Sequence, residues 1–165
     1  MKKNTMSHSV TIRTATVTTS TSAIIINTGY FKSLSGIVKL LQLILGTICV
    51  GLVGYQFSAG NYRTTADLFF LLMTTTFMIS TFILILSCLA SISTESIISK
   101  TIYEVIYHSI AFGLLLACSL TLLVQVNDRY SRDHDRMLAA AICGLINCCL
   151  YLCSTVIALR TYRGL

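Results

Sequence analysis

The stretch LFFLLMTTTFMISTFILILSCLASIS, residues 68–93, contains no charged residue and fourteen Leu, Ile and Phe. On the insertion scale for membrane helices these residues contribute about −0.3 to −0.6 kcal/mol each, so together they favour the bilayer by roughly 4–8 kcal/mol. The stretch also exceeds the roughly 20 residues that a helix needs to cross about 30 Å of hydrocarbon. It therefore predicts a transmembrane helix.

Three further runs, at 40–57, 105–127 and 137–159, also lack Asp, Glu, Lys and Arg. The whole chain is 55% hydrophobic and only 11% charged, with a mean hydropathy of +0.79, whereas about a quarter of the residues in a soluble domain are charged. Because the connections between the runs are short, consecutive helices are expected to be antiparallel neighbours. The sequence predicts an all-α membrane protein, a four-transmembrane-helix bundle with up-down-up-down topology.

The distribution of Lys and Arg predicts that both termini are cytosolic. Eight lie on the side of the termini and four on the other side, and basic residues favour the cytoplasmic side of a membrane. The first group is Lys2, Lys3, Arg13, Lys32, Lys39, Lys100, Arg160 and Arg163, and the second is Arg63, Arg129, Arg132 and Arg136. The net charge of +6 is thus mostly cytosolic and suits anionic inner-leaflet lipid, not nucleic acid.

Residues 1–32 are expected to form a disordered, Ser/Thr-rich cytosolic tail. Eleven Ser or Thr fall between Thr5 and Ser22, and such a segment cannot bury enough apolar surface to fold alone. It has no continuous apolar region of the kind found in a cleaved signal peptide. A solvated tail is the simpler interpretation, and phosphorylation of its hydroxyls beside basic residues is the alternative. The transmembrane domain is expected at 33–163.

Three segments resemble a MARVEL domain, and the nearest branch is that of the CKLF-like and MAL-like members. They are SLSGIVKLLQLILGTICVGLVGY (33–55), TIYEVIYHSIAFGLLLACSLTLLV (101–124) and RMLAAAICGLINCCLYLCSTVIALRTYRG (136–164). The most specific feature is Tyr103, Glu104, Tyr107 and His108 ahead of a run of small residues. The resemblance implies four transmembrane helices, cytosolic termini, and roles in vesicle trafficking, lipid-domain organisation, membrane apposition, junctions or cell fusion.

The resemblance also implies a location in the plasma membrane, in secretory or endosomal vesicles, or in both. The expected partners are membrane lipids, other transmembrane proteins or further copies of this chain. No catalytic, metal-binding or cofactor-binding residue is predicted, because the chain lacks nucleophile-elbow glycines and metal-ligand spacings. The triplet Asp133-His134-Asp135 is better interpreted as a solvated loop than as a cation site. The sequence therefore favours a non-enzymatic protein without a small-molecule substrate.

Five polar residues inside the predicted spans are candidates for an intramembrane network. Lys39 and Glu104 lie a few residues into the first and third helices from the same side, so they are expected at one level as an ion pair. Gln42 and His108 lie one turn deeper on the same faces and form a second expected pair. Asn147, in the middle of the last span, is expected to join helices by a hydrogen bond.

Proton transfer is the alternative role for Glu104 and His108, because intramembrane carboxylates and imidazoles are typical of proton relays. A small proton or ion transporter would, however, need polar groups along the whole path. The predicted spans contain no deep acidic residue in their outer half. The structural role is favoured.

The seven cysteines all lie within predicted spans, so no extracellular disulfide is expected. Cys88 and Cys153 lie nearest the cytosolic boundary and are candidates for acylation, with packing inside the bundle as the alternative. Small residues recur at helix-contact spacing and predict close helix packing. These pairs are Thr47 with Gly51, Ser87 with Ser91, Gly113 with Ala117, and Ala140 with Gly144.

The first testable prediction concerns topology. Epitope tags at Met1 and Leu165 are expected to be inaccessible to antibody on intact cells and accessible after permeabilisation. A tag in the loop at 128–136 is expected to be exposed at the surface if the protein reaches the plasma membrane. A terminus detected on intact cells would show that the number of spans or their orientation is wrong.

Overall fold

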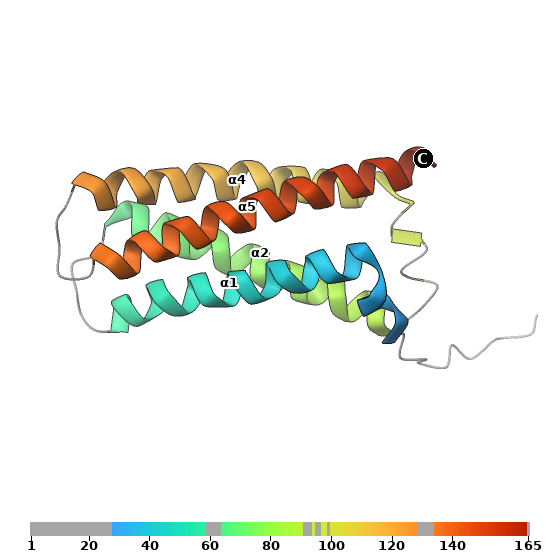
Figure 1. Cartoon of the computed structure of the whole chain (residues 1–165), viewed down its shortest axis with the longest axis horizontal. Coiled ribbons are helices and arrows are strands. Elements are labelled where there is room, and N and C mark those ends of the chain that lie inside the picture. Colours follow the sequence, from blue (N-terminus) through green and yellow to red (C-terminus); the bar gives the residue numbers. More distant parts are fainter. Residues whose placement is uncertain are drawn as a thin grey trace, which may run out of the picture.

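Four long helices form the structure, a computed structural model that describes residues 28–58, 64–90, 94, 97–98, 100–128 and 134–164. The helices are α1 (Leu34–Ser58), α2 (Thr65–Ala90), α4 (Ile102–Asp128) and α5 (His134–Arg163) (Figure 1). They are 25, 26, 27 and 30 residues long, and each is long and apolar enough to cross a membrane. The four predicted spans are therefore confirmed, and each helix extends beyond the uncharged run that predicted it, except at the end of α2.

The helices pack as an up-down-up-down bundle. Each contacts the next along the chain, most extensively α4 with α5, and α1 closes the bundle against α5. The beginnings of α1 and α4 and the ends of α2 and α5 lie at one end of the bundle (Figure 1). The predicted architecture is thus confirmed, and α1 and α4 run parallel across its diagonal.

The helix ends have local causes in the sequence. Ser33 caps α1, because its Oγ accepts a hydrogen bond of 3.1 Å from the Gly36 amide. At the start of α2, Thr64 and Asp67 form a capping box, in which each backbone N–H donates to the other's side chain at 3.0 and 3.3 Å. Beyond α5, Gly164 adopts a φ of 71°, the left-handed conformation that commonly ends a helix.

Buried residues follow a spacing of alternately three and four along every helix, which is the seam of a left-handed bundle. The seams are Lys39, Gln42, Gly46, Cys49, Val53 and Gln56 in α1; Phe70, Thr74, Phe77, Thr81, Leu84 and Cys88 in α2; Glu104, His108, Ala111, Leu115, Cys118 and Leu122 in α4; and Met137, Ala140, Gly144, Asn147, Tyr151, Ser154 and Ala158 in α5. The seams thus combine small, polar and large apolar residues, while other large aliphatic side chains such as Leu72, Ile83 and Val124 are exposed on the outside.

Gly144 is the closest point of contact between helices. A Cβ placed there would lie 2.5 Å from Ser119 Oγ and 2.7 Å from the Phe70 ring, so only glycine lets α5 approach both α4 and α2. Ala140, which the sequence pairs with Gly144 as a small residue four positions away, is fully buried on the same seam.

Two other predicted small-residue contacts are wrong. Gly51, Gly113 and Ala117 are exposed on the outer surface, and a Cβ at either glycine would meet no atom within 4 Å. Their spacing is the same as that of Ala140 and Gly144, but it lies on helix faces that point away from the bundle. Ser91, in the remaining pair, lies outside the described residues.

A short 3-10 helix, η1 (Thr28–Lys32), precedes α1 and packs against α1 and α2. Its Tyr30 is 2% exposed, and burial raises the pKa of the Tyr30 hydroxyl above its usual range, so this group stays neutral. Residues 28–32 were expected to belong to the disordered tail, and in the structure they are folded instead. The rest of that expected tail, 1–27, lies outside the described residues.

The second prediction tests the close approach at Gly144. Gly144→Ala is expected to lower the free energy of unfolding by about 1–3 kcal/mol, because the added methyl group overlaps Ser119 and Phe70. Gly113→Ala is the matched control, since the same change on the outer face meets nothing. Unfolding in detergent by added SDS, followed by thiol labelling of the buried cysteines, measures both. Equal stability of the two variants would contradict the packing.

Candidate functional site

Lys39 and Glu104 form a buried ion pair between α1 and α4. The ammonium group contacts Glu104 Oε1 and donates a second hydrogen bond of 2.9 Å to Ser35 Oγ, one turn earlier on α1. Lys39 is 3% exposed and Glu104 is 4% exposed. The Tyr30 ring covers the ammonium group from η1, with its centroid 5.8 Å from Nζ. The two residues that the sequence placed at one level therefore meet in the interior.

The pairing has a simple electrostatic reason. Either charge alone would be expensive at this depth, because the helix bundle and the hydrocarbon around it solvate ions poorly. Together the two side chains are neutral, and Ser35 and the Tyr30 ring provide further favourable contacts for the ammonium group. The ion pair fixes α1 against α4 in one register.

His108 and Gln42 lie one turn deeper, but they do not hydrogen-bond to each other as expected. The Nδ1 of His108 donates to the Glu104 carbonyl at 2.8 Å, since a carbonyl oxygen can only accept. The Gln42 amide donates to Ser154 Oγ at 2.8 Å. The expected second pair is thus replaced by a contact of α1 with α5, because Ser154 faces the same interior level.

A group of three hydroxyls completes this level of the bundle. Thr81 Oγ1 of α2 lies 2.9 Å from the Tyr107 hydroxyl of α4 and 2.7 Å from the Tyr151 hydroxyl of α5. The His108 ring contacts both tyrosines, with centroids 4.9 and 5.9 Å away. All four helices therefore contribute to one cluster, called the polar layer below. Its members are Lys39, Gln42, Thr81, Glu104, Tyr107, His108, Tyr151 and Ser154.

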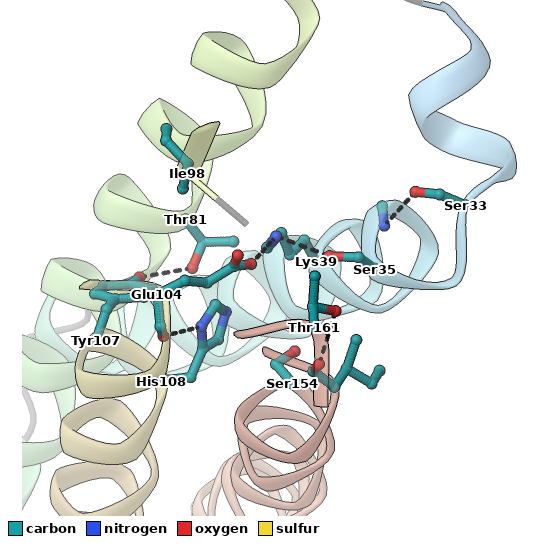
Figure 2. A network of polar contacts seen from close by, with 12 residues as sticks. Ser33, Ser35, Lys39, Thr81, Ile98, Glu104, Tyr107, His108, Ser154 and Thr161 are labelled. Carbon is teal, nitrogen blue, oxygen red and sulfur yellow. Dashed lines mark hydrogen bonds and ion pairs between the residues drawn. The ribbon is translucent and has the colours of Figure 1, made fainter. Parts of the chain in front are cut away.

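Figure 2 shows how part of the polar layer is arranged. Glu104 and Lys39 reach toward each other from α4 and α1, and His108 lies below Glu104 on the same helix. Ser154 approaches from α5 on the opposite side. The arrangement holds polar groups in mutual contact inside the bundle.

Sequence reasoning missed four members of the polar layer: Thr81, Tyr107, Tyr151 and Ser154. The signal was nevertheless present, because Tyr151 and Ser154 follow Asn147 at spacings of four and three, which places all three on one face of α5. Tyr107 adjoins His108. A hydroxyl side chain indicates an intramembrane network less clearly than a charged or amide side chain does. The sequence therefore does not predict that Thr81 of α2 and Tyr151 and Ser154 of α5 provide hydrogen-bonding partners.

Asn147 lies apart from the polar layer. It is buried, and its Oδ1 accepts no hydrogen bond from the residues that the structure describes. Tyr151, the nearest member of the polar layer on α5, lies four residues from Asn147, or about 6 Å along the helix axis. The role of Asn147 in joining helices stays a prediction.

The two cysteines proposed for acylation differ in their surroundings. Cys88 is 2% exposed and lies among the interior residues of α2, where an acylating enzyme cannot reach its thiol. Cys153 points outward from α5, so acylation there remains a prediction. The seven cysteines, all of which the structure describes, form no disulfide. In the part of the chain that the structure describes, no three His, Cys, Asp or Glu side chains gather as metal ligands would.

Comparison with protein families matches residues 30–157 to MARVEL, described as a membrane-associating domain. The match covers more than half of the 165-residue chain and includes α1, α2, α4, most of α5 and the whole polar layer. Neither the curated proteins nor the solved structures gave a match.

The third prediction tests the ion pair by a double-mutant cycle. Glu104→Gln is expected to lower the free energy of unfolding by about 1 kcal/mol, because it leaves the Lys39 ammonium buried without its counter-charge. Adding Lys39→Gln is expected to recover part of this loss. SDS-induced unfolding of the purified variants measures both steps.

The control for this cycle is Asp128→Asn, the same change of carboxylate to amide at an exposed residue at the other end of α4. It is expected to leave stability almost unchanged. Strictly additive losses for Lys39→Gln and Glu104→Gln would mean that the ion pair does not couple α1 to α4.

Proposed function

Because the chain belongs to the MARVEL family of membrane-associating proteins, we propose that it is a non-enzymatic organiser of membranes. In this proposal it acts in vesicle trafficking, membrane apposition or lipid-domain organisation, including junctions or cell fusion. Its place is the plasma membrane, secretory or endosomal vesicles, or both. Membership of the CKLF-like and MAL-like branch stays a prediction.

One observation carries the proposal: the described spans bury the polar side chains of their central parts, while many of their large apolar side chains are exposed on the outside. Lys39, Glu104, His108 and Asn147 are buried, whereas Leu and Ile side chains of all four helices are exposed. A side chain buried in this way cannot contact a lipid or another transmembrane protein. The surface that remains for interaction is the lipid-facing exterior, which suits membrane lipids, other transmembrane helices or a second copy of this chain.

The charges at the two ends of the bundle support contact with anionic lipid on the side of the polar layer. Lys32, Lys100, Arg160 and Arg163 are exposed there. At the opposite end the described Arg136 is accompanied by the exposed carboxylates of Asp128 and Asp135. Each basic residue near an anionic membrane surface contributes about 1 kcal/mol of attraction, so the first end suits the cytosolic leaflet.

A small proton or ion transporter is the competing function, and the burial of Glu104 and His108 is the observation in its favour. The placement of the buried carboxylates argues against it, because Glu104 lies near one end of the bundle and the other described one, Asp67, lies near the start of α2 at the opposite end. A proton path needs hydrogen-bonding groups closer together than this. The organiser is therefore the better-supported function.

The fourth prediction separates the two functions in reconstituted vesicles. Liposomes that contain the purified protein and a pH-sensitive dye are expected to show no proton flux above protein-free liposomes. Glu104→Gln and the exposed control Asp128→Asn are expected to behave alike. A flux that is present in the native protein and the control but lost in Glu104→Gln would favour the transporter.

The organiser role itself is tested in cells from which the protein has been removed. The surface abundance of a subset of membrane proteins is expected to change while their total amounts stay constant, and re-expression is expected to reverse the change. Surface biotinylation followed by quantitative mass spectrometry measures this effect. An unchanged surface proteome together with unchanged membrane lipid order would contradict the proposal.

A further inference from the structure

Two acceptor atoms in the polar layer lack a hydrogen-bond donor among the residues that the structure describes. They are Nε2 of His108 and Oε1 of Gln42. His108 is 0% exposed and Gln42 is 1% exposed, so bulk water does not reach either residue. A buried polar atom without a partner costs about 1–3 kcal/mol. Two such atoms at one level would lower the stability of this small bundle.

The hydrogen bonds already present fix the chemistry of these two atoms. Because His108 Nδ1 donates its hydrogen to the Glu104 carbonyl, the Nε2 of the neutral ring carries a lone pair and must accept. Gln42 uses its amide nitrogen to donate to Ser154, which leaves its carbonyl oxygen, also an acceptor. Two acceptors cannot satisfy each other. A donor must therefore come from a third group.

Gln42 and His108 lie at one level of the bundle, and both contact α5. The contact of Lys39 with Glu104 sets α1 and α4 in register, and Gln42 and His108 lie three and four residues further along these parallel helices. The same turn of α5 contacts both residues, through Ser154 on Gln42 and Tyr151 on His108. Figure 2 shows the His108 ring between Glu104 and Ser154.

The charge of the surroundings selects the kind of donor. The carboxylate of Glu104 is already paired with Lys39, so a bound cation would add an uncompensated positive charge beside an ammonium group. A neutral molecule with two O–H groups fits instead. Water is small enough for a packed interior, and buried waters typically make two to four hydrogen bonds with otherwise unsatisfied polar groups.

We propose that the polar layer binds one water molecule, which donates one O–H to His108 Nε2 and the other to Gln42 Oε1. The hydroxyl of Ser154, whose oxygen accepts from Gln42, has its own hydrogen to donate to the same water. This water joins α1, α4 and α5 at the level where Gln42 and His108 make no direct bond. It is a structural component of the bundle, and it does not depend on the proposed membrane function.

Solid-state NMR of the full chain in phosphatidylcholine bilayers tests the proposal. A variant with His8→Gln and His134→Gln leaves His108 as the single histidine, so its ring nitrogens can be observed with ¹⁵N-histidine. We expect a protonated Nδ1, an unprotonated Nε2, and transfer of magnetisation from water to Nε2. A protonated Nε2, or an unprotonated Nε2 without transfer from water, would overturn the proposal.

A second variant tests whether Gln42 helps to hold the water. Gln42→Leu removes one of the two acceptors, and we expect the transfer from water to His108 Nε2 to be lost. Gln56→Leu is the matched control, because it removes a buried amide from the same face of α1 about 21 Å away, and it is expected to preserve the transfer. Retention of the full transfer in Gln42→Leu would show that the water does not bridge these residues.

Discussion

The ion pair between Lys39 and Glu104 constrains the rest of the bundle, because neither charge is tolerable at this depth without the other. Both side chains are almost completely buried, and a buried charge left without its partner destabilises a structure. The pair contacts directly, so sliding α1 along α4 by one turn, about 5.4 Å, would separate the charges. The register of the two diagonal helices is thereby set. The bond from Gln42 to Ser154 then adds α5 to the same level, and Thr81 adds α2 through the two tyrosines.

In hydrocarbon the usual distinction between a polar surface and an apolar core disappears, and the seams of the four helices reflect this. The lipid-facing side chains are as apolar as any core, so burial of apolar surface does not decide which face of a helix turns inward. Polar groups that need partners and small residues that permit close contact decide it instead. Gly144 illustrates the second case, since any side chain there would overlap Ser119 and Phe70. Helix orientation is thus determined by a minority of residues in each span.

The same physics explains how much of the structure can be predicted from sequence. The spans follow from length and apolar composition, and the meeting of Lys39 with Glu104 follows from their equal depth. The partner of Gln42 does not follow, because Ser154 becomes its neighbour only through the rotation of α5, which no hydropathy pattern specifies. The predicted helix contact at Gly113 and Ala117 is wrong for the same reason. Small-residue spacing identifies a helix face that permits close contact, but it does not specify whether that face points inward. Cys88 and Cys153 are likewise both cysteines near the same end of the bundle, but Cys88 is buried and Cys153 is exposed.

The position of the polar layer has a consequence for what the bundle can do. It lies near the end of the bundle that also carries the exposed Lys32, Lys100, Arg160 and Arg163, and η1 packs against this end with Tyr30 over the ion pair. Beyond Phe77, Ala111 and Cys148, the helices are held mainly by packing of small and apolar residues such as Ala140 and Gly144. The bundle therefore has a half fixed by directional hydrogen bonds and a half fixed mainly by shape. Because the polar side chains of this level are buried, the proposed function places interaction with other molecules in the membrane on the outer faces of the helices.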